Sequence, residues 1–94
     1  MWEVHGSQRV AKALARHGRE LATCYDKAFE KLSRRPRGGK PLKGYEGLYS
    51  SPVTTPGGEH RIIYQLKPEE RIVYVVLTGP REEIYEILKR SGLK

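Results

Sequence analysis

The sequence predicts a small α+β domain in which a pair of helices precedes an antiparallel sheet. Apolar residues recur at helical spacing over residues 21–32, and they alternate with polar residues over residues 60–67. A third segment, residues 72–77, is apolar on both faces, which is typical of a central strand. The chain has 94 residues, so we expect one domain that spans residues 1–94.

The first third of the chain predicts a short strand and a helical hairpin. Residues 2–5 alternate between apolar and polar side chains, as a strand does. Ser7 is a favourable N-cap for a first helix, which should end near Gly18. A second helix begins at Glu20 and carries an apolar stripe on one face. The stripe consists of Leu21, Tyr25, Ala28 and Leu32.

The remainder predicts a loop, three antiparallel strands and a last helix. Residues 34–47 hold four glycines and two prolines and are expected to form a loop. The expected strands are residues 47–53, then residues 60–67 and 72–77. Pro52 interrupts the first of them, so this strand lies at an edge of the sheet or ends there. The last helix should open at Pro80, as its first helical residue. The hairpin should cover one face of this three-stranded sheet, so the other face stays partly open for a site.

A basic segment dominates the charge of the chain. Lys and Arg number 18 against 11 Asp and Glu, which leaves a formal charge of +7. Residues 34–43 contain no acidic residue and few apolar ones, which favours a nucleic acid over a membrane as the partner. The alternative is an ordinary solvated loop. The residues expected to bind RNA are Arg34, Arg35, Arg37, Lys40 and Lys43.

Other classes of protein are disfavoured. No apolar stretch approaches the roughly 20 residues of a membrane helix, and residues 1–5 lack the pattern of a secretory signal. Cys24 is the only cysteine, so an internal disulfide or a cysteine-based metal cluster is excluded. We therefore expect a soluble, cytoplasmic protein without a metal or other cofactor.

Two arginines and a tyrosine are the candidates for chemistry. Arg61 lies inside a strand, where a guanidinium needs a partner or solvent. Arg81 and Tyr85 share one face of the last helix, and Arg81 lies at its N-terminus, which favours an anion. Together they could bind a phosphate, although Arg61 paired with Glu59 and Tyr85 as a packing residue is the simpler alternative. Alternation points His60 away from Arg61, so it ranks lower.

Four segments resemble the RelE/ParE toxin superfamily of bacterial and archaeal toxin–antitoxin systems. They are residues 41–44, 47–49, 60–64 and 79–85, and the resemblance extends over nearly the whole chain. It implies a RelE-like fold, a cognate acidic antitoxin as partner and, for RelE-type members, an endoribonuclease without a metal. These mRNA interferases cleave mRNA in the ribosomal A site by attack of the ribose 2′-hydroxyl. The residues implied as catalytic are Arg61, Arg81 and Tyr85, with His60 at lower rank.

The sequence also departs from the RelE pattern. Ser50, Ser51 and Pro52 stand where RelE proteins usually carry basic residues. If those basic residues supply the proton-transfer group in RelE, this protein needs a substitute. Glu59 is one candidate from a neighbouring strand, with Lys40 and Lys43 as the others. ParE-type members share the fold but inhibit DNA gyrase through protein contacts, and a non-catalytic RNA-binding module is a third possibility. The presence of the two arginines and the tyrosine favours the ribonuclease.

Overall fold

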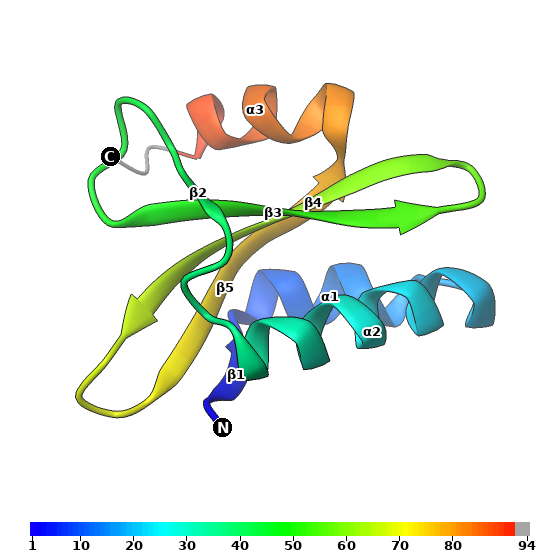
Figure 1. The fold of residues 1–94 in the computed structure, drawn as a ribbon. Coiled ribbons are helices and arrows are strands. Elements are labelled where there is room, and N and C mark those ends of the chain that lie inside the picture. Colours follow the sequence, from blue (N-terminus) through cyan, green and yellow to red (C-terminus); the bar gives the residue numbers. More distant parts are fainter. Residues whose placement is uncertain (92–94) are drawn as a thin grey trace.

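A computed structural model describes residues 1–91 and shows a mixed sheet between two helical layers (Figure 1). The strand order is β1-β5-β4-β3-β2, with β1 parallel to β5 and every other pair antiparallel. Helices α1 and α2 lie on one side of the sheet and α3 lies on the other. The elements are β1 (Glu3–Gly6), α1 (Gln8–Ala15), α2 (Arg19–Arg34), β2 (Lys40–Pro41), β3 (Leu48–Thr55), β4 (Gly58–Lys67), β5 (Ile72–Pro80) and α3 (Arg81–Arg90).

The α+β class is confirmed, but the sheet has five strands instead of three. The three expected antiparallel strands are β3, β4 and β5. The expected N-terminal strand, β1, joins this sheet beside β5 and is parallel to it. The two helices of the hairpin separate β1 from the other strands in the sequence. The strand β2 was missed because it has only two residues, one of them Pro41, within a glycine-rich loop. Local sequence patterns do not specify either of these pairings.

The helix boundaries agree closely with the sequence. The Ser7 hydroxyl caps α1 by accepting a hydrogen bond from the Val10 backbone N–H, as predicted. Two residues of the predicted stripe on α2, Tyr25 and Leu32, are fully buried. Pro80 is the N-cap of α3 and not its first helical residue, a shift of one position. Within residues 1–91 no helix is long and apolar enough to cross a membrane.

The strand β3 continues through Pro52 instead of ending there. It reaches Thr55 and pairs with β4 along its whole length. On its other side, β2 pairs only with Tyr49 and Ser50. Pro52 therefore lies where β3 is the edge of the sheet, a position that tolerates its missing N–H.

The central strand β4 divides the core into two clusters. Ile62 and Tyr64 face the helical hairpin, whereas Ile63 packs against α3. Opposite them, the register moves from Leu77 beside Ile63 to Val75 beside Tyr64, so β5 carries one additional residue in a bulge. The alternation predicted for residues 60–67 is thereby confirmed, and each face of β4 has its own set of neighbours.

A buried tyrosine fixes the loop that follows α2. The Tyr64 hydroxyl donates a hydrogen bond to the Pro36 carbonyl at 3.0 Å and accepts one from the Gly39 N–H at 3.1 Å. A Cβ atom at position 39 would collide with this hydroxyl, so only glycine fits. Burial is the main cause that raises the pKa of Tyr64, which keeps its hydroxyl protonated as a donor. The start of the basic segment is thus attached to the core.

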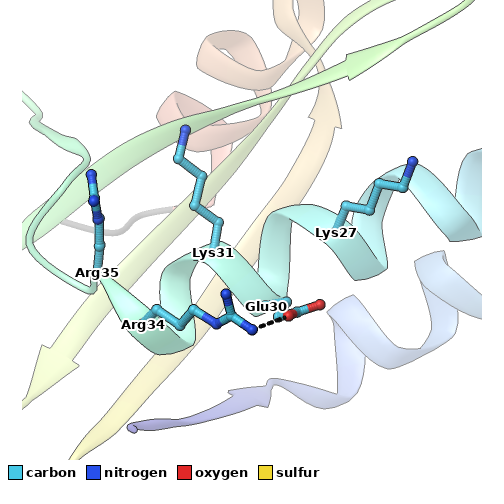
Figure 2. A pocket seen from close by; sticks show the side chains of 5 residues that line it. All are labelled: Lys27, Glu30, Lys31, Arg34 and Arg35. Atoms are coloured by element: carbon cyan, nitrogen blue, oxygen red, sulfur yellow. Dashed lines mark hydrogen bonds and ion pairs between the residues drawn. The ribbon is translucent and has the colours of Figure 1, made fainter.

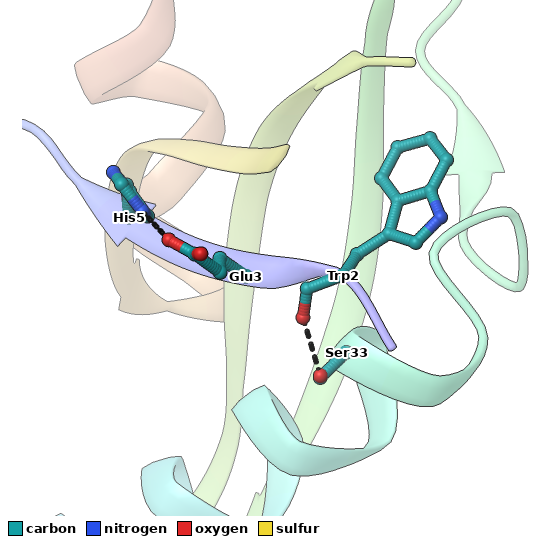
Figure 3. A network of polar contacts seen from close by, with 4 residues as sticks. All are labelled: Trp2, Glu3, His5 and Ser33. Atoms are coloured by element: carbon teal, nitrogen blue, oxygen red, sulfur yellow. Dashed lines mark hydrogen bonds and ion pairs between the residues drawn. The ribbon is translucent and has the colours of Figure 1, made fainter. Parts of the chain in front are cut away.

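The N-terminus is held against the end of α2 (Figure 3). The Trp2 carbonyl accepts a hydrogen bond from the Ser33 hydroxyl, and the Trp2 N–H donates to the Ser33 carbonyl at 3.0 Å. The Arg37 guanidinium lies 5.3 Å from the centroid of the indole ring, a cation–π contact. These contacts hold β1 in place at the edge of the sheet.

Candidate functional site

The two candidate arginines converge on one carboxylate. Glu59 and Arg61 are two residues apart on β4, so both side chains lie on the α3 side of the sheet. Arg81 is the first residue of α3, which begins directly after β5. The Glu59 Oε2 atom is 2.8 Å from Arg61 Nη2 and 3.7 Å from Arg81 Nε. The structure therefore brings Arg61 and Arg81 together, with Glu59 between them.

Arg61 is more enclosed than a residue on an open sheet face. Its side chain is 18% exposed, that of Glu59 is 34% exposed and that of Arg81 is 66% exposed. The expectation of an open face is wrong at this point, because α3 packs on that side of the sheet. A guanidinium so little exposed requires an anionic partner, and Glu59 provides it.

The ion pair leaves polar atoms unused. The Arg61 Nε and Glu59 Oε2 atoms are buried and have no hydrogen-bond partner among residues 1–91. The 2.8 Å contact between Glu59 and Arg61 is therefore an ion pair without the direction of a hydrogen bond. Buried donors and acceptors are almost always paired in folded proteins. A donor without a partner in this position is available to an additional ligand.

Tyr85 lies over the sheet on the same side. Its hydroxyl is 3.5 Å from the Ser50 hydroxyl, a long contact, and the residue is 40% exposed. Ser50 itself is buried on β3 opposite Ile63, which packs against α3. The serine that departs from the RelE pattern is thus the residue that the tyrosine hydroxyl approaches.

The start of α3 adds a feature that favours an anion. Its N-cap, Pro80, makes no side-chain hydrogen bond to the first turn. The unpaired backbone N–H groups and the helix dipole at such a terminus attract negative charge. Arg81 lies in this turn, so its guanidinium and the helix terminus favour the same kind of ligand.

His60 lies on the opposite face of β4, as the alternation predicted. Its Nδ1 atom is 2.8 Å from the Tyr25 hydroxyl. The ring of His17 lies 4.8 Å from that of Tyr25 and 6.5 Å from that of His60, measured between centroids. The structure does not bring His60 together with Arg61 or Tyr85, so a direct role in the same chemistry has no geometric support.

The surroundings of His17 and Tyr25 favour the neutral forms of these two side chains. Burial, and then the proximity of His60, lower the pKa of His17. Burial raises the pKa of Tyr25 to about 12, against a smaller opposite effect of its hydrogen bond with Thr78. Since the side chains of His17, Tyr25 and His60 face one another beneath α2, a charge on any of them disturbs the others. No group of three or more His, Cys, Asp or Glu side chains within residues 1–91 is placed to hold a metal ion.

The basic segment does not form one surface. Arg34 pairs with Glu30 at 2.7 Å, Arg37 contacts the ring of Trp2, and Lys40 lies in β2. Lys43 is exposed in the loop after β2. The structure thus separates the side chains that the sequence placed together, because the chain turns sharply after α2.

One member of the segment, Arg35, is the C-cap of α2 and belongs instead to a basic row that follows this helix. Lys27, Lys31 and Arg35 point the same way (Figure 2) and, with Glu30 and Arg34, line a shallow pocket of about 340 Å³. Their spacing of four residues, which places side chains on one helical face, was the available signal for Lys27 and Lys31. Lys31 and Arg35 also line an adjoining pocket with Ser51 and Pro52 of β3. Pro52 of β3 lies opposite Arg61 of β4 in the sheet. The basic row therefore ends beside the edge strand that neighbours Arg61.

The chain matches one known protein family over most of its length. The family described as ParE-like toxin of type II bacterial toxin-antitoxin system matches residues 4–89. The chain belongs to this family. The superfamily inferred from the sequence is confirmed, whereas no curated protein matches this ParE-like toxin in sequence.

Solved structures of RelE toxins share its fold. E. coli RelE in the intact RelBE toxin–antitoxin complex superposes with a TM-score of 0.72 at 21% identity, over 85% of this chain and 96% of RelE. Isolated E. coli RelE gives 0.71 at 24% identity, over 97% and 99% of the two chains. The RelBE2 complex of Mycobacterium tuberculosis gives 0.71 at 24% identity, over 85% and 98%. The predicted RelE-like fold of this ParE-like toxin is confirmed.

The lowered pKa of His17 predicts a loss of stability in mild acid. The folded protein binds fewer protons at His17 than the unfolded chain, so stability falls as the pH drops below the ordinary histidine value of 6.5. The midpoint of urea unfolding should therefore decrease between pH 7.5 and pH 5. The variant His17→Gln should make this decrease smaller. An identical pH dependence in wild type and His17→Gln would contradict the assignment.

Proposed function

We propose that this ParE-like toxin is an endoribonuclease that cleaves ribosome-bound mRNA. The observation that carries the proposal is the convergence of Arg61 and Arg81 on a single anionic position, on the side of the sheet where Tyr85 also lies. Two guanidinium groups suit a phosphodiester, because each can donate to two phosphate oxygens. A phenol on the same side supplies a hydroxyl for proton transfer.

The proposed reaction requires no group beyond the RNA and the protein. The ribose 2′-hydroxyl attacks the adjacent phosphorus and loses its proton, and the bond from phosphorus to the 5′-oxygen breaks. The products are a 2′,3′-cyclic phosphate and a 5′-hydroxyl, which takes up a proton. Arg61 and Arg81 stabilise the negative charge that develops on the phosphate oxygens, and Tyr85 assists proton transfer.

RNA reaches the site across the edge of β3 in this proposal. The basic row of Lys27, Lys31 and Arg35 adjoins Ser51 and Pro52, which lie at the uncovered edge of the sheet. The RNA backbone would thus be held by phosphate contacts before it meets the arginines.

The similarity to the RelE structures also supports a partner and a location. E. coli RelE is recorded in a complex with its antitoxin RelB. We propose that this toxin binds a cognate antitoxin of acidic character, whose carboxylates would complement the charge of +7. We further propose that it acts in the cytoplasm, where mRNA is translated.

A protein-binding toxin that inhibits DNA gyrase is the alternative. The observation in its favour is that Glu59 already neutralises Arg61, so the arginines could serve structure alone. A non-catalytic RNA-binding module is distinguished by binding without cleavage. Assays of ribosome-bound mRNA and of gyrase supercoiling, run on the same protein preparation, separate the three functions.

The first prediction of this function concerns the chemistry. Arg81→Ala should lower the rate of mRNA cleavage on translating ribosomes by about 10²-fold, the usual effect of removing one donor to a developing negative charge. Tyr85→Phe, which keeps the ring, should also slow cleavage. Arg34→Ala removes an exposed arginine from another Glu–Arg pair and should cleave as wild type does. Fragments should end in a 2′,3′-cyclic phosphate. Gyrase inhibition without RNA cleavage by the wild type would refute the proposal.

The second prediction concerns the basic row. Each Lys or Arg contact to single-stranded RNA contributes about −0.7 to the slope of log binding constant against log salt concentration. Replacing Lys27, Lys31 and Arg35 together with Gln should therefore flatten this slope by roughly two. The control replaces the exposed Arg9, Lys12 and Arg16 of α1 with Gln, which removes the same charge. Equal slopes in the two triple variants would show that the row makes no specific contact.

A further inference from the structure

We infer that Glu59 is a displaceable internal ligand of the anion site, which the RNA phosphate must replace. This inference rests on the proposed function and deepens it, because it assigns a role to the carboxylate that contacts both arginines. In the free protein the carboxylate holds the place of the substrate phosphate between Arg61 and Arg81. In the complex the phosphate takes this place and the carboxylate turns toward solvent.

The first argument is the position of the carboxylate. The same oxygen, Oε2 of Glu59, is the atom nearest to both guanidinium groups, at 2.8 Å from Arg61 and 3.7 Å from Arg81. Those two groups come from separate elements, β4 and α3. The carboxylate oxygen that bridges the two guanidinium groups lies where a phosphate oxygen would be close to both positive charges.

The second argument is that Glu59 satisfies the site incompletely. The Arg61 Nε donor is buried and unused, and Glu59 Oε2 accepts no directed hydrogen bond. A phosphodiester carries two non-bridging oxygens and can accept from both Nε and Nη2 of one guanidinium in a planar pair. The first turn of α3 has no side-chain cap and offers further donors. A phosphate can therefore use more donors than Glu59 does.

The third argument is that the exchange is sterically possible. The Glu59 side chain is 34% exposed, so it can reach water by rotation without unfolding of β4. Arg61 is held more tightly, at 18% exposure, and remains in the site to receive the new ligand. Glu59 thus keeps Arg61 paired while the site is empty, and it opposes weak binding of anions that cannot reach both arginines.

The test compares binding of an RNA that cannot be cleaved. A fluorescent 2′-O-methyl RNA oligonucleotide lacks the attacking hydroxyl, so its Kd from fluorescence anisotropy reports binding alone. Glu59→Gln has nearly the same shape and removes the competing charge, and it should lower Kd by about tenfold relative to wild type. Glu69→Gln is the matched control, because it makes the same charge change in the exposed turn between β4 and β5, away from the arginines and from the basic row. It should lower Kd by less than threefold.

The outcomes separate this inference from the proposed function. A Kd for Glu59→Gln that equals that of Glu69→Gln, or exceeds that of wild type, overturns the inference even if the wild type cleaves mRNA. Tighter binding by Glu59→Gln upholds it even if the wild type cleaves nothing. Should Glu59→Gln fail to fold, titration of the wild type with inorganic phosphate decides the matter. The Nε–H NMR signals of Arg61 and Arg81 should then shift together, and unchanged signals overturn the inference.

Discussion

The alternation of side chains along β4 is the constraint on which the remainder of this structure depends. Ile62 and Tyr64 are completely buried against the helical hairpin, and between them Ile63 is buried against α3. A shift of one residue would exchange the two faces and drive Arg61 into the hairpin core. Burial of an unpaired guanidinium there would cost several kcal/mol, about the whole stability of a small domain. The register that places the site is therefore enforced by the core.

The same alternation separates two polar clusters. On the α3 side, Glu59 forms ion pairs with Arg61 and Arg81. The Arg61 Nε donor has no hydrogen-bond partner among residues 1–91. On the hairpin side, His60 and Tyr25 form a hydrogen-bonded pair, and burial raises the pKa of the Tyr25 phenol. One cluster is suited to bind an anion and the other to pack. Neighbouring residues on one strand thus have different surroundings because they face different layers.

The helix α3 links the stability of the fold to the site. Ile84 and Leu88 are fully buried against β4 and β5, while Arg81 and Tyr85 on the same helix remain exposed. The helix thereby covers Arg61 and presents two further site residues to solvent. Any partner that displaced α3 would remove both of these residues and uncover the Glu59–Arg61 pair in a single step. The same helix therefore supplies residues of the core and two residues of the proposed site.

Sequence reasoning located most of the fold and anticipated that Arg61 and Arg81 lie close together. Patterns with a period of two or of 3.6 residues are local, so they identified β4, β5, the stripe on α2 and the opposite orientations of Arg61 and His60. The cap at Ser7 has a similarly local cause. The parallel pairing of β1 with β5 depends on how the hairpin packs, which no local pattern records.

The failures of sequence reasoning have physical causes too. Arg34, Arg37 and Lys40 are close in sequence, but the turn after α2 sends their side chains to different surfaces. The contact of Glu59 with Arg81 joins residues that are far apart along the chain and depends on the packing of α3. The sequence suggested Glu59 as the partner of Arg61 and, separately, as a proton-transfer group. It did not indicate that one carboxylate serves both arginines.

A structure of the protein with a bound 2′-O-methyl RNA oligonucleotide would test the central claim most directly. The account predicts a phosphate within hydrogen-bonding distance of both Arg61 and Arg81, on the α3 side of the sheet. Glu59 should be turned toward solvent, and the contact between His60 and Tyr25 should be unchanged. RNA bound on the hairpin side, or a Glu59 carboxylate still paired with Arg61 in the complex, would contradict it.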